Sequence, residues 1–261
     1  MSNKSKPFLV WVGGKRKIID KLVEHIPSEI NNYYEPFLGG GALFFNLRDK
    51  YNKAYLSDIN LDLTTSYNAI KNIPDEVSKL SEIHEQNHSK EYFYQIRNNN
   101  DNANPSLISA RFLYLNRYSF RGIYRLNMNG ELKTSYSARS YKSKISDHIK
   151  QSSESLKSAT IYTNDYSFIE PTSGDFVYLD PPYHNSGETF YTRLSFDESE
   201  QVRLKEFVDK LSLKGVKVMI SNSGTDFITN LYKAYNIRII DIKYAIDNGK
   251  TANKEVIITN Y

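Results

Sequence analysis

Short apolar runs alternate with amphipathic stretches along most of the chain. Seven runs have the length and the β-branched or aromatic content of strands; they span residues 33–37, 53–57, 160–162, 176–179, 216–220, 237–242 and 255–259. Helical spacing separates several of them, as over residues 15–25 and in a stretch that begins at Asp197, with Glu200 as capping-box partner, and stops at Gly215. This alternation predicts a mostly parallel sheet that is covered on both faces.

Residues 61–158 do not follow the alternation. Their pattern is mainly helical, with a polar loop at 98–104 and a hairpin-like piece, 123–136, that turns at residues 127–130. We therefore expect an α/β fold with a doubly wound, mostly parallel, Rossmann-like sheet. Residues 1–60 and 159–261 would form that domain, and 61–158 would be an inserted, mainly helical domain that carries a β-hairpin.

Composition limits the class of protein. At 261 residues the chain is one large domain or a domain with a substantial insertion. The absence of cysteine excludes disulfides and thiolate zinc sites and suits a reducing cytosol. The apolar run at 8–12 is too short for a signal peptide, and no run is long enough to span a membrane. We expect a cytoplasmic protein that is not secreted.

Positive charge is concentrated in one segment. The chain has a net charge of +4, yet residues 111–150 hold nine lysines and arginines against two acids. Seven aromatic residues are interleaved with them: Phe112, Tyr114, Tyr118, Phe120, Tyr124, Tyr136 and Tyr141. A confined basic patch with aromatics is typical of a nucleic-acid surface, and the alternative is an ordinary solvated basic face.

A carboxylate, two prolines and an aromatic ring follow the apolar run at 176–179. In Asp180-Pro181-Pro182-Tyr183 the prolines fix the backbone and remove N–H groups, so the Pro181 carbonyl stays outside the strand ladder. This rim offers an anionic acceptor, a carbonyl acceptor and a flat apolar face, which suit a planar ring with an exocyclic amine. The alternative is a strand-to-loop turn that happens to contain Pro-Pro.

A glycine turn and an acid mark a second candidate site. Gly39-Gly40-Gly41 follows the first strand and is expected to open a helix over 42–48, but its spacing is not the dinucleotide fingerprint, and Gly13-Gly14-Lys15 is not a P-loop. Asp58 ends the second strand nineteen residues after Gly39, where an acid binds ribose hydroxyls in doubly wound folds. A ribose without pyrophosphate fits S-adenosylmethionine. The alternatives are a tight turn and a helix cap.

Five segments, in this order, resemble the Dam family of DNA adenine-N6 methyltransferases, and the likeness runs from residue 7 to the C-terminus. They are residues 8–15 (Phe-Leu-Val-Trp-Val-Gly-Gly-Lys), 35–41 (Glu-Pro-Phe-Leu-Gly-Gly-Gly), 57–60 (Ser-Asp-Ile-Asn), 115–118 (Leu-Asn-Arg-Tyr) and 180–183. The resemblance implies site-specific methylation of adenine in double-stranded DNA, S-adenosylmethionine as methyl donor, and a target-recognition domain over residues 61–158.

The resemblance also implies roles for individual residues. Catalysis falls to Asp180, Pro181, Pro182 and Tyr183, and the cofactor to Trp11, Lys15, Phe37, Gly39, Gly41, Asp58, Asp165, Tyr166 and Asp180. DNA binding falls to Arg117, Phe120, Arg121, Arg125, Lys133, Arg139, Asn248 and Lys250. Among these Phe120 would wedge into the duplex and Arg125 would read a base. An exposed hairpin is an equal alternative for Asn248 and Lys250.

Such a reaction requires the adenine to be flipped out of the helix. Hydrogen bonds to Asp180 and the Pro181 carbonyl would favour a pyramidal nitrogen, Tyr183 would hold the ring, and residues 184–196 could close over it. Positioning supplies most of the catalysis, so neither a metal nor a covalent nucleophile is expected.

Several alternatives remain open at this point. Arg121 stands where family members commonly have Asn, and residues 133–136 replace an Asn-Val-Pro-Phe stretch, so GATC is the leading recognition site but not the only candidate. N4-cytosine methylation and a catalytically dead DNA-binding protein are the competing functions.

His84-Glu85-Gln86-Asn87-His88 matches a zinc-protease motif, which we reject because its neighbours are polar and no other candidate site lies near it. The oligomeric state and the biological role, restriction-modification among the options, are left open.

Overall fold

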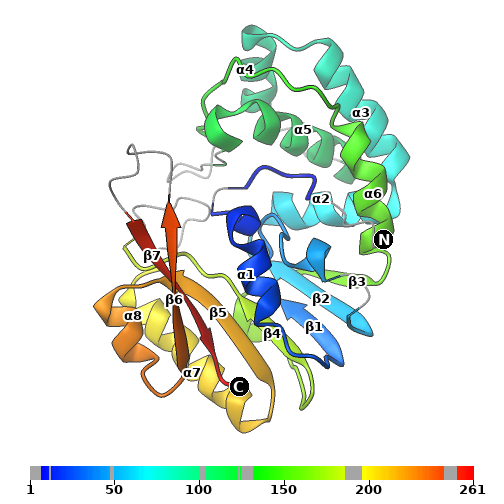
Figure 1. The fold of residues 1–261 in the computed structure, drawn as a ribbon. Coiled ribbons are helices and arrows are strands. Elements are labelled where there is room, and N and C mark those ends of the chain that lie inside the picture. The colour runs from blue at the N-terminus through cyan, green and yellow to red at the C-terminus, as the bar shows by residue number, and fades with distance from the viewer. Residues whose placement is uncertain are drawn as a thin grey trace.

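The computed structural model describes residues 7–11, 13–47, 50–99, 104–122, 124, 132–185, 196–243 and 252–261, without the side chains of 121, 241–243 and 252–253. Within these residues a seven-stranded sheet has the order β3-β2-β1-β4-β5-β7-β6 (Figure 1). The strands are β1 (Asn32–Glu35), β2 (Lys53–Asp58), β3 (Ala159–Thr163), β4 (Phe176–Leu179), β5 (Lys217–Ser223), β6 (Asn236–Lys243) and β7 (Ala252–Thr259). All seven predicted strands are confirmed. Strands β1 to β5 pair in parallel, and β7 runs antiparallel to both β5 and β6.

The helices are α1 (Ile19–Glu24), α2 (Leu61–Asn72), α3 (Pro74–Gln86), α4 (Lys90–Asn98), α5 (Pro105–Tyr118), α6 (Ser146–Leu156), α7 (Glu198–Leu213) and α8 (Asp226–Leu231). Four short 3₁₀ turns are η1 (Lys15–Lys17), η2 (Phe44–Asn46), η3 (Phe120–Gly122) and η4 (Tyr166–Phe168). Asp197 caps α7 as predicted, because its carboxylate accepts from the N–H groups of Ser199 and Glu200. The Glu200 side chain pairs with Arg203. None of the described helices is long and apolar enough to cross a membrane.

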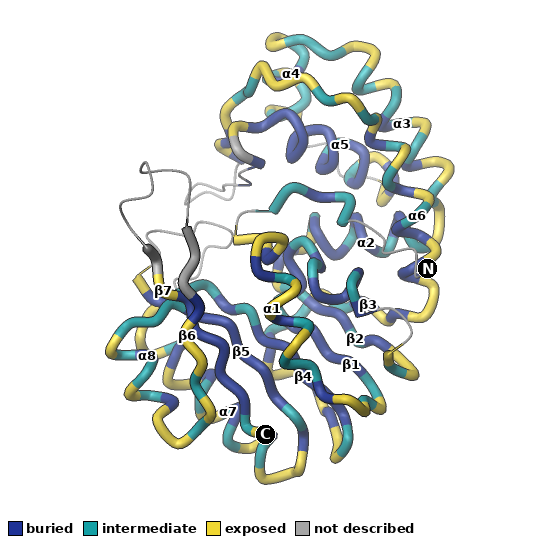
Figure 2. Tube along the Cα trace, viewed as in Figure 1, coloured by how far each residue is buried: buried dark blue, intermediate teal, exposed yellow. Residues whose placement is uncertain are grey.

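Side chains of the central strands alternate between two apolar cores, one on each face of the sheet. On β4, Phe176 and Tyr178 enter one core while Val177 and Leu179 enter the other. The first core includes residues of α1 and α2, and the second includes residues of α7 and α8. Figure 2 shows the buried strands between these helix layers. The predicted doubly wound fold is therefore confirmed.

The insert is built from helices that continue the first core. Helix α2 contacts β2 and β3 as well as α5, and α6 contacts β3 as well as α2 and α3 (Figure 1). An isolated antiparallel bridge joins Ser119 and Tyr136, at the expected base of the hairpin. Residues 123 and 125–131 lie outside the described part of the chain, so the hairpin remains a prediction. The domain boundaries at 61 and 158 remain a prediction.

The expected helix over residues 42–48 is wrong. A single 3₁₀ turn, η2, takes its place, and Arg48 lies outside the described residues. The Phe44 N–H donates to Oε2 of Glu35 at 3.1 Å, while Leu43, Phe44 and Phe45 are all buried. This turn is held in the core by the Glu35 carboxyl group and by its own apolar residues.

Candidate active site at the carboxyl ends of the strands

Asp180 follows β4 at the carboxyl edge of the sheet, beside the end of β5. Ser221 of β5 donates a hydrogen bond to Oδ1 of Asp180 at 2.7 Å, and the Tyr178 hydroxyl lies 2.8 Å from the same serine oxygen. If Ser221 donates to Asp180, Tyr178 must donate to Ser221. Two hydroxyls in series therefore hold the Asp180 carboxylate in a fixed orientation.

Lys15 brings a positive charge to this carboxylate. Its ammonium lies 2.7 Å from Asp180 Oδ1, donates to the Gly13 carbonyl at 2.7 Å, and stands 4.6 Å from the centroid of the Tyr183 ring. The Lys15 side chain is only 7% exposed. A buried ammonium requires such partners, so the ion pair is part of the folded structure.

Two carboxyl groups lie close to this lysine, the buried Glu35 and Asp180, whose side chain is 20% exposed. Burial raises the pKa of Asp180, although Lys15 and Ser221 oppose the rise. Burial also raises the pKa of Glu35 to about 8, against hydrogen bonds from Tyr33 and Phe44 and with the help of the Asp180 charge. At neutral pH we therefore assign the negative charge to Asp180, which has the direct ion pair, and a proton to Glu35.

Strand β7 fixes the Tyr183 ring through the tyrosine hydroxyl. Its hydroxyl donates to Oε2 of Glu255 at 2.9 Å, and Glu255 on β7 is buried. The pKa of Tyr183 is raised well above its usual value, by burial first and then by the charges of Asp180 and Glu255. The phenol therefore stays protonated and serves as an anchor for the ring.

Two buried amides, those of Gln201 and Asn222, tie the Pro-Pro turn to its supports. Gln201 on α7 donates to the Pro182 carbonyl at 2.9 Å and accepts from the Asn222 amide at 3.0 Å. Asn222 in turn accepts from the His184 N–H at 3.1 Å. Pro181 and Pro182 have no N–H, so the turn cannot be held by donors of its own. The bonds to the Pro182 carbonyl and the His184 N–H hold it instead.

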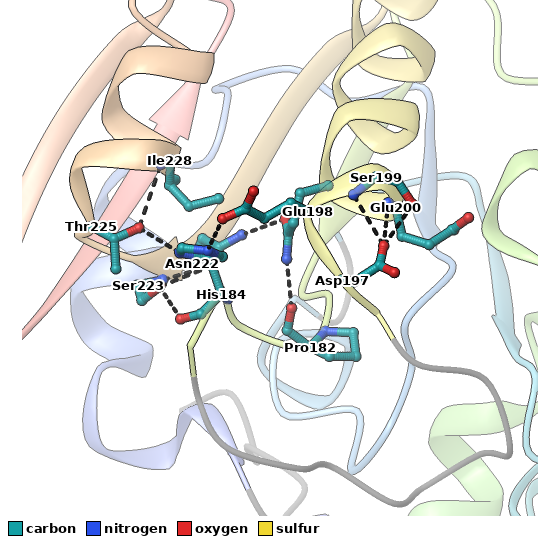
Figure 3. Close-up of polar contacts among 11 residues, drawn as sticks. Pro182, His184, Asp197, Glu198, Ser199, Glu200, Asn222, Ser223, Thr225 and Ile228 are labelled. Carbon is teal, nitrogen blue, oxygen red and sulfur yellow. Dashed lines mark hydrogen bonds and ion pairs between the residues drawn. The ribbon is translucent and has the colours of Figure 1, made fainter.

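His184 joins three further elements, two of them through its imidazole. Its Nδ1 lies 2.9 Å from the Thr225 hydroxyl and its Nε2 lies 3.2 Å from the Glu198 carboxylate, while Ser223 donates to its backbone carbonyl at 2.7 Å (Figure 3). A proton on Nε2 satisfies Glu198 and leaves Nδ1 to accept from Thr225. The residue after Asp180-Pro181-Pro182-Tyr183 is thereby fixed between the starts of α7 and α8.

The glycine turn and Asp58 come together at the ends of β1 and β2. The Gly39 N–H donates to Oδ2 of Asp58 at 2.9 Å, and the Asn60 N–H donates to Oδ1 at 3.0 Å. Burial raises the pKa of this carboxyl, which these hydrogen bonds oppose. Gly39 has a φ of +45°, and a Cβ there would lie 2.8 Å from the Trp11 indole, so a side chain is excluded by the ring as well as by the backbone.

Next to this turn lies an aromatic cluster formed by Phe37, Tyr166 and Phe196. The Phe37 and Tyr166 rings stack at 5.1 Å, and Phe196 meets Phe37 edge-on at 5.8 Å. Tyr166 is buried, and its hydroxyl has no hydrogen-bond partner among the described residues. The Asp165 carboxylate lies 2.6 Å from the Arg203 guanidinium. Partial burial acts to raise the pKa of Asp165, but hydrogen bonds from Arg203 and Ser167 outweigh it and lower the pKa.

The structure corrects one expected DNA contact. Arg117 is buried: its guanidinium pairs with Glu85 at 3.4 Å, donates to the Ser143 carbonyl and lies over the Tyr141 ring. These contacts join α3, α5 and the segment before α6. Arg117 is expected from the sequence to bind DNA, but in the structure the residue holds the insert together.

The other DNA candidates divide into two groups. Phe120 on η3 is 51% exposed, and Lys133 and Arg139 are exposed. The side chain of Arg121, all of Arg125, Asn248 and Lys250, and residues 186–195 of the expected lid lie outside the described part of the chain. Their roles remain predictions.

The histidines of the zinc-protease pattern face tyrosines. Nδ1 of His84 lies 2.8 Å from the Tyr92 hydroxyl, and Nδ1 of His88 lies 2.9 Å from that of Tyr114. Helix α3 ends at Gln86, so the two histidines do not share one helix. Within the described residues, no three histidine, aspartate or glutamate side chains are grouped as metal ligands.

Sequence comparisons agree with this geometry. The family model for D12 class N6 adenine-specific DNA methyltransferases matches residues 11–246. The type II methyltransferase M.MjaIII of Methanocaldococcus jannaschii is 36% identical, over 98% of this chain and 99% of that protein. M1.LlaDCHI of Lactococcus lactis subsp. cremoris is 35% identical over 98% and 95%, and the DNA adenine methylase of Escherichia coli (strain K12) is 30% identical over 96% and 93%. The chain therefore belongs to the D12 class of N6 adenine-specific DNA methyltransferases.

Proposed function

We propose that this chain transfers a methyl group from S-adenosylmethionine to N6 of an adenine flipped out of double-stranded DNA. The position of Lys15 is the observation that carries the proposal. Its ammonium lies 2.7 Å from Asp180 Oδ1 and 4.6 Å from the Tyr183 ring centroid. A positively polarised N–H donor can thus contact the Tyr183 ring and the Asp180 carboxylate at the same time. The amine of an adenine stacked on Tyr183 would do the same.

The residues beside the glycine turn fit S-adenosylmethionine. Asp58 has carboxylate lone pairs left for ribose hydroxyls after it accepts from Gly39 and Asn60, and the amide nitrogen of Asn60 is buried with no partner among the described residues. Phe37 and Tyr166 offer aromatic surface for an adenine. Trp11, Gly39 and Gly41 shape the turn, while Lys15 and Asp180 join this site to the catalytic motif. When bound, the cofactor supplies an electrophilic methyl group on a sulfonium.

Asp180 and Pro181 act on the nitrogen that receives the methyl group. The amine donates one hydrogen bond to the Asp180 carboxylate and one to the Pro181 carbonyl, which favours a pyramidal nitrogen with its lone pair directed away from both acceptors. Asp180 then holds the proton that becomes acidic as the N–C bond forms. The burial that raises the pKa of Asp180 makes it a better proton acceptor for this step.

The insert presents DNA-binding groups on the same protein. Phe120 is a half-exposed aromatic residue that can fill the gap left by a flipped base, and Lys133 and Arg139 are exposed cations suited to phosphates. Arg125 would read a base edge in the major groove. Because of the resemblance to the Dam family, GATC is the leading recognition sequence, with Arg121 and residues 133–136 as the positions that could change it.

Methylation of plasmid DNA with labelled S-adenosylmethionine, followed by digestion to nucleosides, tests the proposal. Label in N6-methyladenosine supports it. Label in N4-methylcytosine, or DNA binding without any label, would contradict it. Long-read sequencing of DNA from an expressing host identifies the methylated site, and GATC or a variant of it is the expected result.

A further inference from the structure

Trp11 lies between the glycine turn, residues 39–41, and Tyr124 of the insert. On one side, the indole is so close to Gly39 that a Cβ there would lie 2.8 Å from Nε1. On the other side, the ring stacks with Tyr124 at 6.4 Å and 25°, and Phe112 packs against both rings. A movement of the glycine turn would therefore be transmitted to Tyr124 through close packing.

Tyr124 has a second connection to the same turn. Its hydroxyl donates to Oδ2 of Asp62 at 2.6 Å, in the first turn of α2. Helix α2 is capped by Asn60, whose N–H donates to Asp58 at 3.0 Å. Tyr124 is 6% exposed, so both its ring and its hydroxyl are held in the interior.

The chain around Tyr124 is fixed to the N-terminal segment that carries Trp11. Asn116 bonds both the N–H and the carbonyl of Val10, at 3.1 and 2.7 Å, and also donates to the Gly122 carbonyl at 3.2 Å. Gly122 has a φ of +70°, and a Cβ there would lie 2.7 Å from Val10. The segments on either side of the Trp11–Tyr124 contact therefore move as one unit.

We propose that Tyr124 is a positioning residue that couples cofactor binding to DNA recognition, through Trp11 to the Gly39 turn and through Asp62 to Asp58. This rests on the proposed function, because it takes Asp58 and Gly39 as the cofactor side and Phe120, on the η3 turn before Tyr124, as the DNA side. Coupling of this kind is reciprocal, so each ligand tightens the other by the same factor.

The single tryptophan of the chain makes the coupling measurable, since Trp11 is the only contributor to indole fluorescence. The dissociation constant of S-adenosylhomocysteine is measured with and without a short duplex that contains the mapped methylation site. In the wild type, we expect the duplex to tighten binding at least about fivefold and to change Trp11 fluorescence. In Tyr124→Ala the factor should fall below about twofold and the fluorescence response to DNA should be lost, while cofactor alone still changes the signal.

Tyr124→Phe keeps the ring and removes only the bond to Asp62, so it should fold and should retain the fluorescence response with a reduced coupling factor. Tyr235→Phe is the matched control, because it removes a tyrosine–aspartate bond, to Asp209 of α7, beside the second core. The inference is overturned if the wild type binds both ligands without coupling, or if both Tyr124 variants keep the wild-type factor. Failure of the wild type to bind either ligand would instead contradict the proposed function.

Discussion

The Lys15 ammonium and the Asp180 carboxylate form a buried ion pair of 2.7 Å at the carboxyl edge of the sheet. Lys15 comes from the first turn after the N-terminal segment, and Asp180 comes from the end of β4. The pair keeps Asp180 ionised although burial raises its pKa. In the proposed reaction the amine of the target adenine donates a hydrogen bond to this same carboxylate.

Ser221→Ala should shift the pH dependence of methylation. Burial already raises the pKa of Asp180, and loss of the Ser221 hydrogen bond removes a group that favours the ionised form. The acid limb of the activity profile should therefore move to higher pH, by up to about one pH unit. Profiles of kcat/KM between pH 5 and pH 9 measure this shift. Ser212→Ala in α7 is the control, and an acid limb that does not move would contradict the assignment of Asp180.

Gln201→Leu should slow methyl transfer more than it weakens cofactor binding. The exchange removes the bond to the Pro182 carbonyl and leaves the buried Asn222 amide without its acceptor, at a cost of roughly 1–3 kcal/mol in unfolding free energy. The Pro-Pro turn then loses its support from α7. We expect kcat to fall by about tenfold or more, which corresponds to at least ~1.4 kcal/mol in the transition state.

The same exchange at Gln151, a half-exposed position of α6, provides the control for Gln201→Leu. It should leave both kcat and the unfolding free energy nearly unchanged, since surface changes are usually within about 0.5 kcal/mol. A Gln201→Leu enzyme with normal kcat would show that the amide contacts do not position the motif.

Phe120→Ala should impair base flipping. Phe120 is a large apolar side chain left half exposed on η3, next to the base of the hairpin. Without it, the gap left by the flipped base is not filled, so the extrahelical state loses roughly a few kcal/mol of support. A duplex with 2-aminopurine at the target position should give a weaker fluorescence increase than with the wild type. Ile239→Ala, at a position of β6 that is 60% exposed against 51% for Phe120, should not differ from the wild type.

Much of the site was predictable because strand ends can be recognised in a sequence. Asp58 and Asp180 directly follow apolar runs, and polar residues at carboxyl ends of parallel strands converge. Ser221 and Asn222 follow the run at 216–220 in the same way and could have been found by this rule. Gln201 could not, because a glutamine inside an amphipathic helix shows no preference for burial. Arg117 was misassigned, since a cation in a basic segment is read as exposed until its partner Glu85 is placed beside it.

Glu35→Gln should make stability less dependent on pH. The folded-state pKa of Glu35 is raised to about 8 by burial, above the value of 4.5 expected when unfolded. Its contribution to stability is therefore fully present below pH 4.5 and is lost as the pH rises towards 8. The neutral amide of the variant does not titrate, so this pH-dependent contribution is absent from it. The unfolding free energy of the variant relative to the wild type should therefore change by more than about 1 kcal/mol between pH 5 and pH 8.

Urea titrations at each pH provide the free energies for Glu35→Gln. The exposed Glu170→Gln variant should show no such change. If the two variants behave alike, Glu35 does not carry a proton in the folded protein.

The most direct test of the account is the single-turnover rate of methyl transfer by Asp180→Ala, with S-adenosylmethionine and duplex DNA both saturating. Asp180 is proposed to bind the reacting amine and to hold its proton, so the rate should fall by about 10² to 10⁴ relative to wild type. The unfolding curve and the Trp11 fluorescence are measured on the same sample to show that the variant is folded. A folded Asp180→Ala enzyme that methylates adenine at the wild-type rate would contradict the central claim.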